Sequence, residues 1–170
     1  GQHQMWAAQR LGHHRPRGFI SSGGLGTMGY GIPAAVGAQL GCPDDLVVAV
    51  TGDGSLQMGM PELGTAKEQK LPLKILLLNN QYLGMVKQLQ YSYCDRRYTA
   101  VQFTDNPEFK YFAKAYGAAY ISVAKAEELP EAMAQFIGQP GMVILEAFVT
   151  PEENVYPMVV GDKGLDEMEM

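Results

Sequence analysis

A short turn that could bind a cation and a phosphate together stands at residues 52–55, Gly-Asp-Gly-Ser. Gly52 and Gly54 let the backbone approach a ligand closely, and free N–H groups at the start of a following helix can face an anion. The carboxylate of Asp53 would repel a phosphate unless a divalent cation lay between them. Mg²⁺ prefers oxygen ligands and usually takes one or two protein groups, with phosphates and water completing its octahedron. An ordinary turn in which Asp53 caps a helix explains these residues equally well.

A pair of asparagines makes the cation interpretation more specific. Asn79 and Asn80 follow the next apolar segment, and Asn80 comes 27 residues after Asp53. Because adjacent parallel strands end at the same edge of a sheet, we expect the two polar ends to meet there. The side-chain oxygen of Asn80 is a neutral ligand for Mg²⁺, and the backbone carbonyl of Tyr82 could supply a third oxygen. A lone Asn-Asn pair would predict only a turn.

The elements that would position these residues alternate between apolar strands and helices. Strands are predicted over residues 19–21, 46–51, 74–78, 119–123 and 142–149. Helices are predicted over residues 31–40, 61–70, 83–93, 106–116 and 126–137, with Pro107 in a first turn and Gly117 as a C-cap. This alternation predicts an α/β fold of three αβα layers with a mostly parallel sheet. Three polar or glycine-rich turns then fall at the carboxyl ends of strands, which suggests one shared ligand.

Composition limits the class of protein. The 170 residues suit one domain, which we place over residues 1–150, followed by an acidic, irregular tail over 151–170 that would lie on the surface or over a neighbouring domain. Apolar residues make up 46% and permit a sizeable core, whereas a net charge of −5 argues against nucleic acid as a partner. The sequence does not begin with Met, which is consistent with an excised domain.

The expected cellular location, and the absence of a Cys/His metal site, are inferred from features that the sequence lacks. It contains no run of 18 apolar residues and no signal peptide, so no membrane partner is expected. Cys42 and Cys94 form no disulfide framework, which favours the reducing cytoplasm. No Cys/His metal cluster is present, and His13 and His14 beside Arg15 predict a solvated loop.

The motifs resemble those of a known family. Gly-Asp-Gly followed by Asn-Asn at this spacing is similar to the thiamine-diphosphate fingerprint, and three longer segments sharpen the likeness: GQHQMWAAQ at 1–9, SGGLGTMGYG at 22–31 and LLLNNQYLGMV at 76–86. Together they resemble the C-terminal domain of the acetolactate (acetohydroxyacid) synthase large subunit. The resemblance covers most of the chain, weakens after about residue 88, and implies a thiamine-diphosphate-binding fold.

This resemblance assigns roles to individual residues. It implies that Asp53, Asn80 and the Tyr82 carbonyl hold Mg²⁺. The residues implied to contact thiamine diphosphate are Gln2, His3, Gly26, Met28, Gly52, Asp53, Gly54, Ser55, Asn80, Tyr82, Leu83, Gly84 and Met85. Among them, the amides of Gly54 and Ser55 would face the diphosphate, with Gln2 and His3 on its other oxygens. Without the resemblance, His3 would be interpreted as part of a frayed terminus.

Met28 would lie under the cofactor and impose a V shape, which brings the aminopyrimidine amine against the thiazolium C2–H so that it can remove the proton. The cofactor then serves as the electron sink. Gly26 would line the thiazolium ring beside Met28, and Met85 would line the same cavity. The alternative for Met28 is core packing, the commoner role of methionine.

The family reaction decarboxylates pyruvate and condenses the two-carbon unit with a second 2-keto acid, pyruvate or 2-ketobutyrate, in branched-chain amino-acid biosynthesis. The activating Glu comes from a pyrimidine-binding domain and FAD binds in a central domain. Neither domain lies in this chain, so the catalytic residue is unknown here and the chain alone is expected to be inactive. The parent enzyme is expected to be a homodimer or tetramer, with a regulatory subunit as a further partner.

One position departs from the family pattern. Many members carry Trp where this sequence has Leu89, and that Trp is associated with the acceptor pocket and with sulfonylurea-type inhibitors. Leu89 is therefore assigned to the substrate pocket, and the preference for the acceptor is open. Ordinary helix packing is the alternative for Leu89.

Other functions remain as alternatives. Gly24, Gly26 and Gly29 match G-x-G-x-x-G, and Asp53 follows, so a dinucleotide-binding domain is a rival. That interpretation leaves Asn80 unexplained. A different thiamine-diphosphate enzyme acting on 2-keto acids is a further alternative. A non-enzymatic binding domain is disfavoured because both predicted metal ligands are present.

Overall fold

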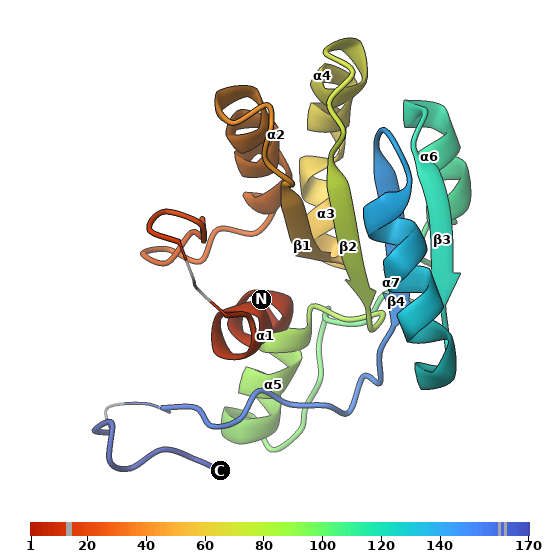
Figure 1. Ribbon diagram of the computed structural model, residues 1–170. Coiled ribbons are helices and arrows are strands. Elements are labelled where there is room, and N and C mark those ends of the chain that lie inside the picture. Colours follow the sequence, from red (N-terminus) through yellow and green to blue (C-terminus); the bar gives the residue numbers. More distant parts are fainter. Residues whose placement is uncertain (13–14, 160, 162) are drawn as a thin grey trace.

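The computed structural model describes residues 1–12, 15–159, 161 and 163–170, so the loop predicted at His13 and His14 lies outside the described residues. Its sheet consists of β1 (Val48–Gly52), β2 (Lys74–Asn79), β3 (Ala119–Val123) and β4 (Val143–Phe148), in the order β1-β2-β4-β3 (Figure 1). All three pairings are parallel. Gly52 pairs with Leu78, so Asp53 and Asn80 leave the sheet at the same edge, as predicted.

The α-helices along the chain are α1 (Gln2–Arg10), α2 (Gly31–Gly41), α3 (Asp53–Gly59), α4 (Leu63–Glu68), α5 (Gly84–Tyr93), α6 (Phe109–Tyr116) and α7 (Leu129–Gly138). Two 3₁₀ turns, η1 (Met60–Glu62) and η2 (Ala126–Glu128), precede α4 and α7. Gly117 ends α6 in the left-handed conformation, at φ 73°, and thus confirms the predicted C-cap.

The sheet is covered on both faces. Ile75 and Leu77 of β2, with Ile144 of β4, pack against apolar residues of α2, α3, α4 and α6. Val143 and Leu145 point to the opposite face and pack against α7, which lies in front of the sheet in Figure 1. This burial explains why the segments of β2 and β4 are almost continuously apolar, and it confirms the three-layer αβα prediction.

One predicted strand does not form. Residues 19–21 form no strand, and together with residues of β1 they line a cleft of about 810 Å³. Phe19 and Ile20 are exposed on this segment. Three residues offer few ladder hydrogen bonds, which is too little to secure a strand that the chain otherwise holds away from the sheet.

Three helices, α4, α6 and α7, begin two or three residues later than predicted, and prolines explain two of these shifts. The predicted helix over 61–70 is η1 followed by α4, because Pro61 has no N–H to donate, and Lys70 at φ 54° ends the segment. Pro130 similarly stands at the start of α7, after η2. Helix α6 begins at Phe109, so Pro107 lies before it rather than in its first turn. Asn106 is held instead by side-chain hydrogen bonds with Gln57 and Asp53.

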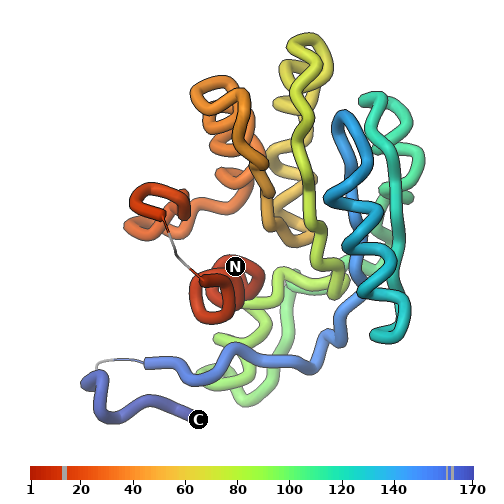
Figure 2. Tube along the Cα trace, viewed as in Figure 1, coloured from red at the N-terminus to blue at the C-terminus, as the bar shows by residue number. Residues whose placement is uncertain are grey.

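The predicted tail is partly packed. Figure 2 shows the segment that follows β4 passing along α5 on its way to the C-terminus. Val155 is fully buried, and both its N–H and its carbonyl bond to the side chain of Gln88 on α5. Helices α1 and α5 and this segment together lie beyond the carboxyl ends of β1 and β2.

Candidate functional site

A cavity of about 180 Å³ opens at the carboxyl ends of β1 and β2, where α1, α3 and α5 begin. It is lined by Gly1, Gln2, His3, Trp6, Gly26, Met28, Gly52, Asp53, Gly54, Ser55, Leu78, Asn80, Tyr82, Leu83, Gly84, Met85 and Val86. The three turns singled out in the sequence therefore meet around one space. All thirteen residues that the resemblance assigns to the cofactor are among them.

Asp53 is the buried charge of this cavity. It is the first residue of α3 and only 1% exposed, and its Oδ2 accepts a hydrogen bond from Asn106 Nδ2 at 2.7 Å. Burial raises the pKa of the Asp53 carboxyl, while hydrogen bonds from Asn106 and from the backbone at Gly54 and Gln81 oppose the rise. A cation beside this carboxylate would offset the cost of burying its charge.

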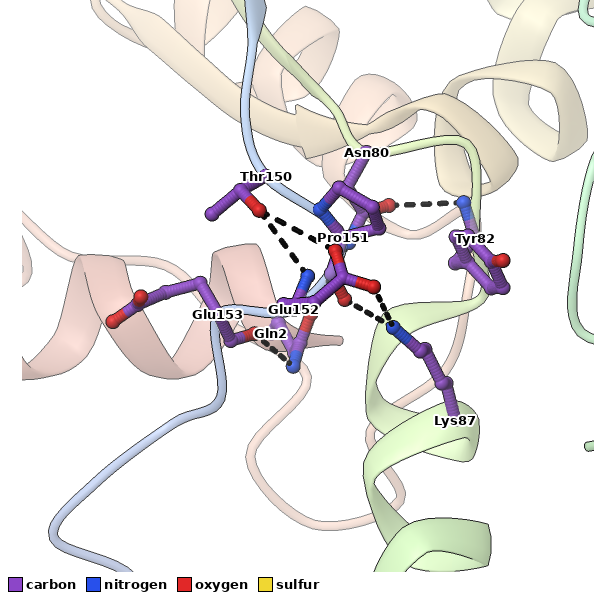
Figure 3. A network of polar contacts seen from close by, with 8 residues as sticks. All are labelled: Gln2, Asn80, Tyr82, Lys87, Thr150, Pro151, Glu152 and Glu153. Carbon is purple, nitrogen blue, oxygen red and sulfur yellow. Dashed lines mark hydrogen bonds and ion pairs between the residues drawn. The ribbon is translucent and has the colours of Figure 1, made fainter. Parts of the chain in front are cut away.

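Asn80 presents its side-chain oxygen to the turn that follows β2. Its Oδ1 accepts the N–H of Tyr82 at 3.0 Å, and its Nδ2 donates to Gln2 Oε1 at 3.2 Å (Figure 3). An amide oxygen has two lone pairs, so Oδ1 keeps one for a further ligand. Gln81 between them adopts a left-handed conformation at φ 60°, a strained state for a non-glycine residue.

A neighbouring segment holds this strained turn in place. Leu83 N–H donates to the carbonyl of Val101 at 2.8 Å, and Phe103 N–H donates to the carbonyl of Gln81 at 2.8 Å. Tyr82 forms an isolated antiparallel bridge with Gln102. These backbone contacts fix the residues whose oxygens are the predicted cation ligands.

Gln2 is more deeply engaged than the sequence indicates. Its Nε2 donates to Gln88 Oε1 at 3.0 Å and to the carbonyl of Glu153 at 3.1 Å, and its Oε1 accepts from Asn80. Both amide hydrogens are thus used within the protein, and the side chain connects Asn80 to the segment after β4 (Figure 3). The backbone N–H of Gln2, at the first position of α1, remains the group with which this residue would contact a diphosphate.

His3 covers the end of β1 and is electrically neutral at neutral pH. A Cβ added to Gly52 would lie 3.0 Å from His3 Nδ1, so only glycine fits easily under the ring. Burial, reinforced by the positive charge of the N-terminal amino group, lowers the pKa of His3 to about 4. The neutral imidazole retains one N–H donor for an anion.

The starts of α1 and α5 converge on the cavity. The first N–H groups of a helix have no intrahelical partner and favour anions. Gly84 makes the convergence possible, because a Cβ there would stand 2.1 Å from Gln2 Oε1 and 2.7 Å from Asn80 Nδ2. The volume of about 180 Å³ is below the roughly 300–1,000 Å³ of pockets that enclose a whole small molecule, so the space suits one part of a ligand.

Ser55 ties the glycine-rich segment to the same cavity. Its Oγ accepts the N–H of Gly29 at 3.0 Å, and a Cβ on Gly29 would collide with Met58. This anchor places Met28 at the cavity, where it is 45% exposed. Met28 therefore offers an apolar surface to a ligand and is not buried core.

The donor set is poor in charged metal ligands. No group of three or more His, Cys, Asp and Glu residues suited to a metal occurs among the described residues. One carboxylate, one amide oxygen and a backbone carbonyl leave several positions for phosphate oxygens and water, which is the usual arrangement for Mg²⁺. The residues present therefore fit a cation that is shared with a bound diphosphate.

Comparison with known families identifies the domain. Residues 1–147 match the family of the C-terminal TPP-binding domain of thiamine pyrophosphate enzymes. The chain belongs to this family. Thiamine pyrophosphate is thiamine diphosphate, and the match favours a TPP-binding domain over the dinucleotide-binding alternative for the glycines at 24–29.

Three relatives of this TPP-binding domain carry the name acetolactate synthase. It is 46% identical over 168 residues to the acetolactate synthase isozyme 2 large subunit of Escherichia coli, covering 99% of this chain and 31% of that protein. It is 47% identical over 167 residues to the mitochondrial acetolactate synthase catalytic subunit of Saccharomyces cerevisiae, covering 98% of this chain and 24% of that protein. The acetolactate synthase large subunit of Porphyra purpurea is 44% identical over 169 residues, covering 99% and 28%. The chain thus spans about a quarter to a third of the length of these curated relatives.

Some features of the TPP-binding domain escaped the sequence interpretation. Trp6, Leu78 and Val86 line the cavity, although the resemblance assigns none of them a contact with the cofactor. Asn106 contacts Asp53, although the sequence predicts it only as the first residue of a helix. Leu89 lies on α5 with 43% of its surface exposed and does not line this cavity. In the described part of the domain, no helix is long and apolar enough to cross a membrane.

Proposed function

We propose that this chain binds the diphosphate of thiamine diphosphate together with Mg²⁺, as the cofactor domain of an acetolactate synthase. The observation that carries the proposal is the convergence of Asp53, Asn80 and Tyr82 with two helix starts around one cavity. In this assignment Asp53 Oδ, Asn80 Oδ1 and the Tyr82 carbonyl bind the cation. The N–H groups of Gly54 and Ser55, with those of Gln2 and His3, bind phosphate oxygens.

The apolar side of the cavity would receive the thiazolium ring. Gly26, Met28 and Met85 line it, and Leu83 and Gly84 complete the wall at the start of α5. When bound, thiamine diphosphate supplies a carbon nucleophile and an electron sink for the decarboxylation of a 2-keto acid. The chain's own residues orient the cofactor and keep its charged end neutralised.

We infer the reaction from the three relatives described above, each of which is named an acetolactate synthase. The longer enzyme would decarboxylate pyruvate and join the two-carbon unit to pyruvate or 2-ketobutyrate in branched-chain amino-acid biosynthesis. A pyrimidine-binding domain with the activating Glu and an FAD domain would lie elsewhere in that enzyme. A homodimer or tetramer, a regulatory subunit and a cytoplasmic location belong to the same proposal.

Calorimetry tests the cofactor assignment directly. Thiamine diphosphate titrated into the purified chain should release measurable heat in Mg²⁺ and none in excess EDTA. Asp53→Ala should abolish the binding seen in Mg²⁺, because it removes the one carboxylate of the set. Asp45→Ala is the matched control, since Asp45 pairs with Arg15 in a mostly exposed ion pair away from the cavity. Binding by Asp53→Ala equal to that of the parent chain would refute the ligand assignment.

The role of Leu89 in the acceptor pocket is a second part of the proposal. Leucine offers less rigid apolar surface than tryptophan, and one methylene in an apolar pocket contributes roughly 1–3 kcal/mol of discrimination. In the full-length enzyme we expect Leu89→Trp to strengthen both the preference for 2-ketobutyrate over pyruvate and the binding of flat aromatic inhibitors. The product ratio in a competition between the two keto acids measures the first effect. An unchanged ratio with unchanged inhibition would place Leu89 in ordinary helix packing.

A further inference from the structure

Glu146 is a buried carboxylate that the packing of the sheet does not require. It lies on β4, between Leu77 of β2 and Ser122 of β3, and is only 3% exposed. None of the ion pairs found in the described part of the chain includes it. Since burying an unpaired carboxylate is costly, a leucine would suit the surrounding apolar strands better unless the carboxylate has a task.

The carboxylate has two hydrogen-bonded neighbours, one of which leads to the cofactor cavity. Asn79 Nδ2 donates to Glu146 Oε1 at 2.6 Å, and the Tyr120 hydroxyl donates to Oε2 from the other side. Asn79 is the residue immediately before Asn80, at the end of β2. Glu146 is therefore connected by one side chain to the turn that carries the predicted cation ligands.

The connection continues from Asn79 to Asp53. Asn79 Oδ1 accepts the N–H of Gln81 at 3.0 Å and approaches Asn106 Nδ2 at 3.4 Å. Asn106 Nδ2 also donates to Asp53 Oδ2 at 2.7 Å. Gln57 Nε2 donates to Asn106 Oδ1 at 3.1 Å, which holds the Asn106 amide in this orientation.

The direction of each bond follows from chemistry. An ionised carboxylate can only accept, so Glu146 requires Asn79 to present its NH₂ group. The oxygen of Asn79 must then face the N–H of Gln81 and the NH₂ of Asn106. Asn106, held in turn by Gln57, directs a donor at Asp53. The acceptor at Glu146 thus orients the side-chain amide of Asn79 and, through it, that of Asn106. Asn79 then directs its oxygen at the Gln81 turn, and Asn106 directs its NH₂ group at Asp53.

We propose that Glu146 is a positioning residue of the cation site, which acts through Asn79 and Asn106 on Asp53 and on the turn that carries Asn80 and Tyr82. This role rests on the proposed binding of Mg²⁺ and thiamine diphosphate. It assigns a function to a residue of the central sheet that touches neither the cation nor the cofactor.

A reversal of the Glu146–Asn79 hydrogen bond provides the sharpest test. Glu146→Gln keeps the shape but leaves one carbonyl oxygen where the carboxylate offers two, and at best it replaces the charge-assisted bond from Asn79 by a weaker neutral one. Asn79→Asp combined with Glu146→Gln restores the pair with donor and acceptor exchanged, and the carboxylate introduced on β2 still accepts from Gln81 and Asn106. Tyr120→Phe is the matched control, because it removes the other partner of Glu146 on the side away from the cavity.

The measurements are the Mg²⁺ affinity in the presence of saturating thiamine diphosphate, by calorimetry, and the urea midpoint of each variant. Residues that support metal ligands typically change metal affinity 10- to 100-fold when altered. We expect Glu146→Gln to weaken Mg²⁺ binding at least about 10-fold and the double variant to restore it to within about threefold. Tyr120→Phe should lower the urea midpoint and leave the Mg²⁺ affinity of the folded chain unchanged.

Three outcomes would overturn the proposal: wild-type Mg²⁺ affinity in Glu146→Gln, an equal loss in Tyr120→Phe, or a folded double variant that still binds Mg²⁺ weakly. Should Glu146→Gln fail to fold, Asn106→Ser is the substitute test, because it removes the side-chain amide that donates to Asp53 and alters only a partly exposed residue. An unchanged Mg²⁺ affinity in Asn106→Ser would refute the hydrogen-bonded connection between Glu146 and Asp53. A parent chain that binds no thiamine diphosphate in Mg²⁺ would refute the proposed function itself, whereas a binding parent with an unaffected Glu146→Gln refutes only the positioning role.

Discussion

Gly84 occupies the tightest position in the cavity wall. A methyl group there would meet Gln2 Oε1 at 2.1 Å and Asn80 Nδ2 at 2.7 Å, so both side chains would have to move. We expect Gly84→Ala to lower the free energy of unfolding by about 1–3 kcal/mol, the usual cost of overpacking, and to weaken cofactor binding because Asn80 shifts. Urea unfolding and calorimetry measure the two effects.

Gly37 offers a matched control for this substitution. It lies within α2, and an added Cβ would find no atom within 4 Å. Gly37→Ala should therefore be neutral or should raise stability by up to about 1 kcal/mol, since alanine favours helices. Equal effects of the two substitutions would mean that the crowding at Gly84 is relieved without consequence.

His3 should make the stability of the chain depend on pH. Its pKa in the folded chain is about 4, below the ordinary 6.5, because the imidazole is buried. A depressed pKa contributes stability that is present above pH 6.5 and is lost as the pH falls towards 4. From the two pKa values we expect the parent chain to lose about 2 kcal/mol more than His3→Gln between pH 7 and pH 5. Urea unfolding at both values provides the comparison, and parallel losses would contradict a buried neutral His3.

Some residues of the candidate site could be predicted from the sequence and others could not. Asp53 and Asn80 could be predicted to meet because each follows an apolar strand and the two strands are sequential neighbours. Glu146 could not, since its contact with Asn79 depends on β4 lying beside β2, an order that local patterns do not specify. Asn106 could not, because its bonds to Gln57 and Asp53 join residues 49 and 53 positions apart. Gln2 was assigned to the cavity, but its bonds to Gln88 and Glu153 connect segments about 86 and 151 residues apart.

At the scale of elements, two side chains of α5 hold the segment after β4: Lys87 bonds Pro151 and Glu152, and Gln88 bonds Val155. Gln88 is buried, accepts the N–H of Val155 at 2.8 Å and donates to its carbonyl at 3.0 Å, as a neighbouring strand would. Gln88→Leu would leave these backbone groups and one hydrogen of the Gln2 amide without partners, at about 1–3 kcal/mol for each unsatisfied group. We expect the part of the segment around Val155 to detach and to be cleaved faster by a protease at native conditions.

Gln90 lies two residues further along α5 and serves as the control for Gln88. Its side chain also bonds backbone groups, those of Thr99, but at an exposed position where water can replace it. Gln90→Leu should change cleavage of the C-terminal segment little. Similar cleavage of the two variants would show that Gln88 does not hold the segment.

The elements themselves were predictable where the pattern was long and apolar. Four of the five predicted strands form within two residues of their expected bounds. The central strands β2 and β4 are mostly buried, whereas the edge strands β1 and β3 are partly exposed. The fifth, at residues 19–21, fails because a strand also needs an edge to pair with, and its pairing with β1 does not occur. Helix starts near Pro61 and Pro130 shifted because each proline lacks an N–H, which residue periodicity does not reveal. The start of α6 shifted to Phe109 while Asn106 bonds Gln57 and Asp53.

For the whole molecule, we expect the purified chain alone to make no acetolactate. The cavity is large enough for one part of the cofactor, and the carboxyl partner proposed for its pyrimidine ring lies in another domain. Incubation with pyruvate, Mg²⁺ and thiamine diphosphate, followed by a colorimetric assay for acetolactate, tests this. Turnover by the chain at a rate near that of a full-length enzyme assayed in parallel would contradict the assignment as a domain.

The strand order has a consequence for how the chain is made. β4 is the last strand in the sequence, yet it lies inside the sheet, between β2 and β3. When residues up to about 140 have emerged from the ribosome, β2 and β3 are therefore present without the strand that lies between them. The apolar side chains of Ile75, Leu77 and Phe136 then have no complete core in which to pack. Parallel pairing of strands that are far apart in the sequence is slow, because the entropy cost of closing a long loop comes before the contacts that offset it. The nascent chain should consequently depend on chaperones until residue 148 has emerged, and a gene truncated before that point should yield insoluble protein.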